Sequence, residues 1–139
     1  MENIDRRTTL AFVLAAASAA ALGEKAQAHT VDASKDQTIG PGVTVRAYGE
    51  AESIIPGFKS AKVYDVIMQP GSKTPDATSP MTAALVCQMA EGELRLLREG
   101  KDVPVKMNEV WTCIVGTNEL AFNDTKAVAV MRVISLTPA

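Results

Sequence analysis

Short apolar runs recur along most of the chain at intervals of about ten residues, and many of them alternate apolar with polar positions. Turn-forming pairs such as Pro70-Gly71, Glu91-Gly92 and Glu99-Gly100 separate them. Helical periodicity is weak beyond residue 28, so the pattern predicts an all-β sandwich or barrel preceded by a loose polar arm over 29–38. The strands are expected at 43–48, 61–68, 84–90, 93–98, 103–106, 110–115, 119–122 and 127–136.

Residues 1–28 have a different pattern, which is typical of an export signal. Arg6 and Arg7 precede an apolar run from Leu10 to Leu22, and this run is shorter than the ~20 residues that cross a bilayer. Ala26-Gln27-Ala28 then gives the small-x-small pattern of a cleavage site. The paired arginines favour the twin-arginine route, and the general secretory route stays open. We therefore expect a single mature domain over 29–139, located in the periplasm or outside the cell.

Composition excludes several functional classes. The chain has 139 residues, a formal net charge of −2, one His and two Cys. A balanced charge without a basic run gives no basis for nucleic-acid binding. One His excludes a multi-His metal site and a Ser-His-Asp triad late in the chain, and two Cys exclude a Cys-rich zinc fold.

Two motifs occupy the region from Pro70 to Asn123. In the second, the residues Asn108, Ile114, Gly116, Glu119 and Asn123 have the spacing of the pattern Gly-x5-Pro-x-Gly-x2-His-x3-Asn. Gly116 and Asn123 match that pattern, and Glu119 stands at its His.

The first motif begins at Pro70-Gly71 and ends in the turn 90–94, which reads Ala-Glu-Gly-Glu-Leu. Ala77 and Ser79 stand at its two His positions, and Leu85 stands at its Glu. Together the two motifs resemble those of the cupin superfamily, over roughly residues 40–136. The resemblance implies a single double-stranded β-helix, which is a jelly-roll barrel.

The resemblance also identifies where a cupin would hold its metal, through three imidazoles and one carboxylate. Ala77 and Leu85 have no donor atom, the Ser79 hydroxyl is a poor ligand, and only Glu119 is competent. We expect no cofactor and no metal at these positions, with copper or another metal at an unconventional site left open. His29 would need a second imidazole to chelate copper, and the methionines are interpreted as core filling.

The roles of Glu119 and Cys87 each have more than one interpretation. Glu119 is either a buried acid, base or ligand-orienting group, or a solvated carboxylate at a wet barrel mouth. Cys87 should share the inward face of Leu85 as a reactive thiol, a soft ligand, a small core residue or half of a disulfide with Cys113. The candidate binding residues are Ala77, Ser79, Leu85, Cys87, Trp111 and Glu119.

The function expected from these residues is that of an exported, metal-free cupin that binds a small molecule or a protein partner at its barrel. One alternative is a metal-independent enzyme that uses Glu119, with or without Cys87, for proton transfer on a small substrate. Another is a structural subunit whose exposed β face forms a dimer, and we expect a homodimer. The sequence does not identify the ligand.

Overall fold

The computed structural model describes residues 33–76 and 80–139. The expected signal segment, His29, Ala77 and Ser79 lie outside the described residues. A short 3-10 turn at Ala33–Lys35 precedes nine strands. The strands are β1 (Gln37–Gly40), β2 (Val43–Glu52), β3 (Phe58–Met68), β4 (Ala84–Glu91), β5 (Leu94–Arg98), β6 (Lys101–Val105), β7 (Val110–Cys113), β8 (Glu119–Phe122) and β9 (Ala129–Pro138).

All eight expected strands are present, and the all-β prediction is confirmed. The prediction of a loose arm through residue 38 is wrong at its end, because Gln37–Gly40 forms β1 and pairs antiparallel with β2. This edge strand is mostly exposed, so it has no apolar alternation by which it could be found. The Arg46 guanidinium donates to both carboxylate oxygens of Asp36, at 2.9 and 2.7 Å, and so ties the start of β1 to β2.

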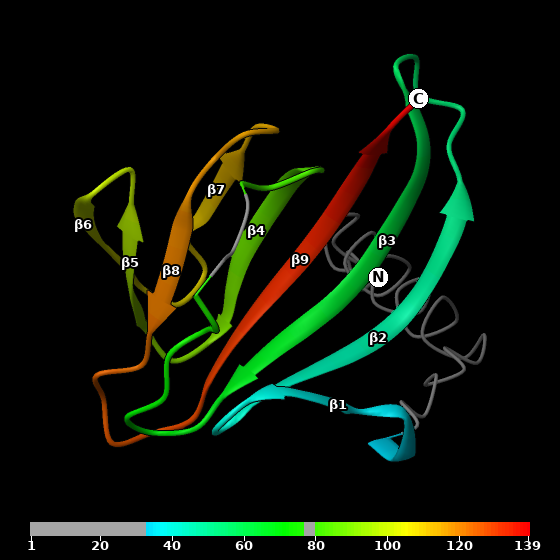
Figure 1. Cartoon of the computed structure of the whole chain (residues 1–139). Helices are drawn as coiled ribbons and strands as arrows, with labels where there is room; N and C mark the ends of the chain where they lie inside the picture. The colour runs from blue at the N-terminus through cyan, green and yellow to red at the C-terminus, as the bar shows by residue number, and fades with distance from the viewer. Residues whose placement is uncertain (1–32, 77–79) are drawn as a thin grey trace, which may run out of the picture. The chain divides into compact units, whose positions relative to one another are not determined.

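The strands form two antiparallel sheets that enclose one core. The larger sheet has the order β1-β2-β3-β9-β4-β7, and the smaller has the order β6-β5-β8 (Figure 1). The larger sheet contributes Val43, Val66, Met68, Met89, Met131 and Val133 to the core, and the smaller contributes Leu94, Leu96, Val105 and Ala121. Three methionines therefore fill the core as expected, whereas Met107 is exposed.

Asn123 connects the two sheets at the end of β8. Its side chain is fully buried, and its Nδ2 donates to the carbonyl oxygens of Met68 (2.9 Å) and Ala127 (2.8 Å). Its Oδ1 accepts from the backbone nitrogen (3.0 Å) and the hydroxyl (2.7 Å) of Thr125. All four bonds of the amide are used, so the end of β3 is held against the loop that leads from β8 into β9.

The backbone explains two motif positions. Asn108 stands where the cupin pattern has Gly and has a φ of 71°, in the left-handed region that Asn tolerates better than most residues. Gly92 has the same φ, and a Cβ there would lie 2.8 Å from the carbonyl oxygen of Val128. At both positions the residue present is therefore one that can adopt the left-handed conformation that the turn requires.

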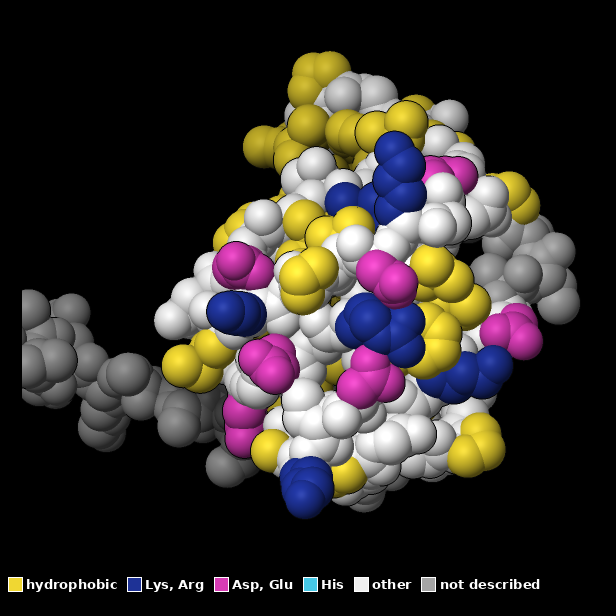
Figure 2. Space-filling model, turned by 90° about the vertical axis from the view of Figure 1, so that its left-hand side faces the viewer, with side chains coloured by type: hydrophobic (Ala, Val, Ile, Leu, Met, Phe, Trp, Pro, Cys, Tyr) yellow, Lys and Arg dark blue, Asp and Glu magenta, His cyan; other side chains and the backbone are white. Residues whose placement is uncertain are grey.

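Charged side chains of both signs alternate on the outer side of the smaller sheet (Figure 2). No field of one charge covers this face, in keeping with the net charge of −2. Within the described residues, no helix is long and apolar enough to cross a membrane.

We predict that Asn123→Ala lowers the free energy of unfolding by about 3 kcal/mol, because the buried Met68 carbonyl and the Thr125 backbone nitrogen lose their bonds to Asn123 and the Ala127 carbonyl loses one of its two donors. Urea unfolding of the full chain measures this. Asn118→Ala is the matched control, since Asn118 is exposed and no described residue bonds to its side chain. Equal stability of the two variants would contradict the role given to Asn123.

Candidate functional site

A cavity of about 450 Å³ opens between the two sheets. Most of its wall is apolar, and the polar groups are few. The apolar residues are Ile39, Val66, Pro75, Met81, Leu85, Ala121, Met131 and Val133, and the others are Tyr64, Thr74, Asp76, Cys87 and Glu119. This volume and composition are typical of a site for a small organic molecule.

The structure brings three of the expected site residues together in this wall. Leu85 and Cys87 face the cavity from β4, as the period of two along a strand requires, and Glu119 faces it from the start of β8. Trp111 is half-buried and contacts the core without lining the cavity.

The loop that follows β3 completes the wall. The Thr74 backbone nitrogen donates to the Ala121 carbonyl (2.9 Å), and the Ala121 nitrogen donates to the Thr74 hydroxyl (2.9 Å). This pairing against β8 places Thr74, Pro75 and Asp76 at the cavity. Their position depends on long-range pairing, so nothing in their local sequence identified them as site residues.

Glu119 is buried and paired, so the expectation of a solvated side chain is wrong. Its side chain is 6% exposed, and its Oε2 accepts from Arg98 Nε at 2.8 Å. Arg98 and Glu119 are direct partners in the register of β5 and β8, which brings their side chains to the same face. The guanidinium stabilises the carboxylate charge in a site that is mostly apolar.

Sequence reasoning missed Arg98. Both strands were predicted, but the register between β5 and β8, which makes Arg98 and Glu119 neighbours, is set by tertiary structure. Two polar atoms near the pair have no partner among the described residues, namely Arg98 Nη2, which is buried, and Glu119 Oε1. The carboxylate can therefore accept one more hydrogen bond.

Two free thiols adjoin this ion pair. Cys113 Sγ lies 3.6 Å from Glu119 Oε2 and donates to it. The interaction between the two thiols lowers the pKa of Cys113, against burial and the Glu119 carboxylate, which raise it, and the same interaction, together with burial, raises the pKa of Cys87. The two sulfurs are therefore chemically unequal, and Cys113 is the one that ionises first.

The donor set does not fit the metal of a cupin. Leu85 contributes only carbon, and Glu119 Oε2 is already occupied by Arg98 and Cys113. In the described ranges 33–76 and 80–139, no group of three His, Cys, Asp or Glu side chains is arranged to hold a metal ion.

A groove of about 590 Å³ adjoins the cavity and shares Ile39, Tyr64, Val66 and Thr74 with it. Its far part is lined by β2 and β3, including Glu50 and Lys62. Burial raises the pKa of the Tyr64 hydroxyl, which therefore stays a neutral donor between the two spaces.

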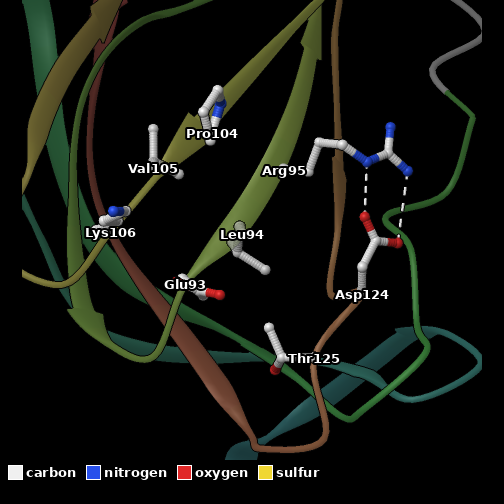
Figure 3. A pocket seen from close by; sticks show the side chains of 8 residues that line it. All are labelled: Glu93, Leu94, Arg95, Pro104, Val105, Lys106, Asp124 and Thr125. Atoms are coloured by element: carbon white, nitrogen blue, oxygen red, sulfur yellow. Dashed lines mark hydrogen bonds and ion pairs between the residues drawn. The ribbon is translucent and has the colours of Figure 1, made fainter.

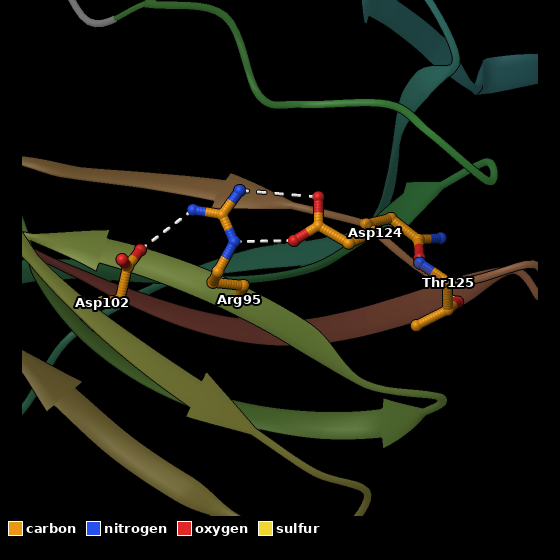
Figure 4. A network of polar contacts seen from close by, with 5 residues as sticks. Arg95, Asp102, Asp124 and Thr125 are labelled. Atoms are coloured by element: carbon orange, nitrogen blue, oxygen red, sulfur yellow. Dashed lines mark hydrogen bonds and ion pairs between the residues drawn. The ribbon is translucent and has the colours of Figure 1, made fainter.

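A smaller pocket of about 220 Å³ lies beside β5 and β6, with Arg95 and Asp124 on its rim (Figure 3). Arg95 is already bonded to Asp124 at 2.6 Å and to Asp102 at 2.9 Å (Figure 4), and it lies over the Phe122 ring at 4.2 Å. These bonds raise the pKa of Arg95 and satisfy its charge. We therefore assign this network to holding the three strands of the smaller sheet together.

No family model matches the sequence, and no curated protein matches it significantly. Solved structures do match the fold. An RmlC-like cupin from Shewanella frigidimarina has a TM-score of 0.62 at 12% identity, covering 84% of this chain and 91% of its own. A sugar phosphate isomerase of the cupin superfamily from Silicibacter pomeroyi has a TM-score of 0.60 at 17% identity, over 77% and 74%.

A predicted oxalate decarboxylase from Thermotoga maritima also has a TM-score of 0.60, at 16% identity, over 78% of this chain and 98% of its own. These likenesses establish the cupin-type jelly-roll fold that the motifs indicated. The named activities of the neighbours differ from one another, so the fold alone does not assign one of them here.

We predict that Arg98→Met lowers the free energy of unfolding by about 2 kcal/mol, because Glu119 is then buried without its cation. Adding Glu119→Gln to that variant should restore part of the loss, since the unpaired charge is removed. Denaturant unfolding of the single and double variants measures the coupling. Lys62→Met, which breaks the exposed pair with Glu50, is the control and should change stability by less than about 0.5 kcal/mol. Similar losses in Arg98→Met and Lys62→Met would rule out a special role for the buried pair.

Proposed function

We propose that this chain, which has the cupin fold, is a metal-independent binding protein that holds a small organic molecule in the cavity between its sheets. The observation that carries the proposal is the placement of Glu119. A carboxylate with a nearly fully buried side chain lines a largely apolar cavity of about 450 Å³, and one of its oxygens has no partner among the described residues.

The chemistry of the wall indicates the ligand class. The apolar residues suit a hydrocarbon body, which is desolvated on binding. Glu119 Oε1 suits a hydrogen-bond donor, and the Tyr64 hydroxyl, which has no partner among the described residues, can complete the contact. An amine or alcohol with a compact apolar body meets both requirements.

Metal independence is part of the proposal and rests on donor chemistry. Leu85 and Glu119 supply one carboxylate at two of the four aligned positions, and Ala77 and Ser79, at the other two, offer no imidazole. A first-row ion there would lack donors in a desolvated space.

We also propose that the protein acts outside the cytoplasm, after removal of residues 1–28. The support is the Arg-Arg pair, the short apolar run and the Ala-Gln-Ala pattern. A denaturing mass spectrum of protein from its native cell should give the mass of residues 29–139, and an uncleaved chain would contradict the proposal.

Proton-transfer catalysis is the second candidate function. It is favoured by the contact between Cys113 Sγ and Glu119 Oε2, which provides a path for a proton to the cavity wall. The two functions differ in their response to Glu119→Gln, because catalysis requires a base at this position whereas the apolar part of binding does not.

We predict that benzylamine binds in the cavity and that benzoate, which has a similar shape and the opposite charge, does not. Calorimetric titration of each compound into the full chain measures this. Glu119→Gln should weaken benzylamine binding about tenfold, and Leu85→Phe should weaken it by filling the cavity. Glu91→Gln, an exposed change on β4, should leave it unaltered. Equal binding by wild type and Leu85→Phe would place the amine elsewhere and overturn the assignment.

We predict that the purified protein contains well under one equivalent of Fe, Mn, Ni, Zn or Cu. Elemental analysis after dialysis measures the metal content, and a thermal melt with and without chelator tests whether a metal contributes to stability. A stoichiometric metal that survives dialysis, or a chelator-dependent drop in Tm, would overturn metal independence.

A further inference from the structure

We propose that Cys87 and Cys113 form a redox site that a hydroperoxide oxidises to an intramolecular disulfide, with Glu119 as the proton acceptor. This inference goes beyond the binding function proposed above and does not require an organic ligand in the cavity. It rests on the placement of the two thiols, the carboxylate and Arg98.

The strand register brings the two cysteines together. Cys113 is the direct partner of Leu85, and Cys87 is the partner of Trp111, so Cys87 and Cys113 are diagonal neighbours on the inward face of β4 and β7. A disulfide needs Cα atoms within about 7 Å, which is the short end of a diagonal separation. β7 is a four-residue edge strand that pairs with β4, so a local adjustment of β7 that brings the two sulfurs together involves no third strand of the sheet.

The surroundings separate the roles of the two thiols. Cys113 donates to Glu119 Oε2 and is the thiol that ionises first, so it is the nucleophile. Cys87 lines the cavity and is the partner that closes the bond. Glu119 is held in place by the bond from Arg98 Nε. The charged groups that act on the two sulfurs are Glu119 and Arg98, and the Tyr64 hydroxyl in the same cavity wall also interacts with Cys87.

The oxidation balances in two steps. Cys113 sulfur attacks the terminal oxygen of ROOH as its proton passes to Glu119, the O–O bond breaks, and the proton goes on to the departing alkoxide to give ROH. The product is the sulfenic acid of Cys113. Cys87 sulfur then attacks that sulfur, the S–O bond breaks, and water leaves with the Cys87 proton. Two thiols lose two electrons, and the peroxide gains them.

The burial of both thiols requires a small oxidant. Cys87 is 1% exposed and Cys113 is 4% exposed, so a protein or a bulky disulfide cannot reach either sulfur directly. A hydroperoxide can enter the cavity, where Cys87 and Glu119 are lining residues, and it reaches Cys113 beside Glu119, since Cys113 Sγ lies 3.6 Å from Glu119 Oε2. The resulting disulfide would also remove the hydrogen bond that the Cys113 thiol donates to Glu119 Oε2 in the reduced protein.

The test uses the full chain, reduced and then exposed to hydrogen peroxide. Intact-mass analysis should show a loss of two hydrogens per chain, and peptide mapping without reductant should give a single Cys87–Cys113 cross-link. Two free thiols after treatment that fully oxidises free cysteine, or cross-links between chains, would overturn the proposal.

Variants test the assigned roles. In Cys87→Ser, a sulfenic acid should accumulate on Cys113 and react with a dimedone-type reagent. In Cys113→Ser, the remaining thiol, Cys87, should react with hydrogen peroxide much more slowly. In Glu119→Gln, disulfide formation should be about tenfold or more slower than in the wild-type chain, and in Glu91→Gln its rate should equal that of the wild-type chain. Trapping of the sulfenic acid on Cys87 instead, or an unchanged rate in Glu119→Gln, would overturn the mechanism. Circular dichroism of each variant establishes that it is folded.

Discussion

The buried amide of Asn123 is the interaction on which the enclosed shape of this molecule depends. It joins the end of β3, the end of β8 and the loop before β9, and its own backbone adds bonds to Gly71 and Ser72. Those bonds hold the loop after β3 along β8, and this loop supplies Thr74, Pro75 and Asp76 to the cavity. An apolar residue of similar size could fill the space, but it would leave the buried Met68 carbonyl and the Thr125 backbone nitrogen without the bonds that the Asn123 side chain makes to them.

The second constraint is electrostatic, and it is located where the two sheets meet. Glu119 from β8 lies between Arg98 from β5 and Cys113 from β7, so one carboxylate connects the smaller sheet to the edge of the larger one. The ion pair makes a buried charge tolerable, and it leaves one carboxylate oxygen and the thiol pair as the reactive groups of the site. The proposed binding and the proposed thiol chemistry therefore depend on the same few contacts.

In this chain, the cupin motif positions that shape the backbone differ in their fate from the positions that would hold a metal. The positions that shape the backbone are retained or replaced by residues that can adopt the same conformation, as at Gly92, Asn108 and Asn123. The described positions that would hold a metal carry Leu85 and Glu119 instead. The solved cupins superpose on this chain at identities of 12–17%, which shows a shared fold and assigns none of their activities to it.

Local pattern determined the eight main strands, the turns between them and the inward face shared by Leu85 and Cys87, because alternation and turn chemistry are encoded within a few residues. It could not reveal β1, whose exposed residues are held by backbone pairing and by the bond from Arg46 to Asp36. Nor could it show that Glu119 is buried, that Arg98 neutralises it or that Cys113 touches it. Those facts follow from the register between strands and from the approach of the two sheets. Only the tertiary structure decides them, because Arg98 lies on another strand, more than twenty positions from Glu119, and Cys113 lies on the other sheet.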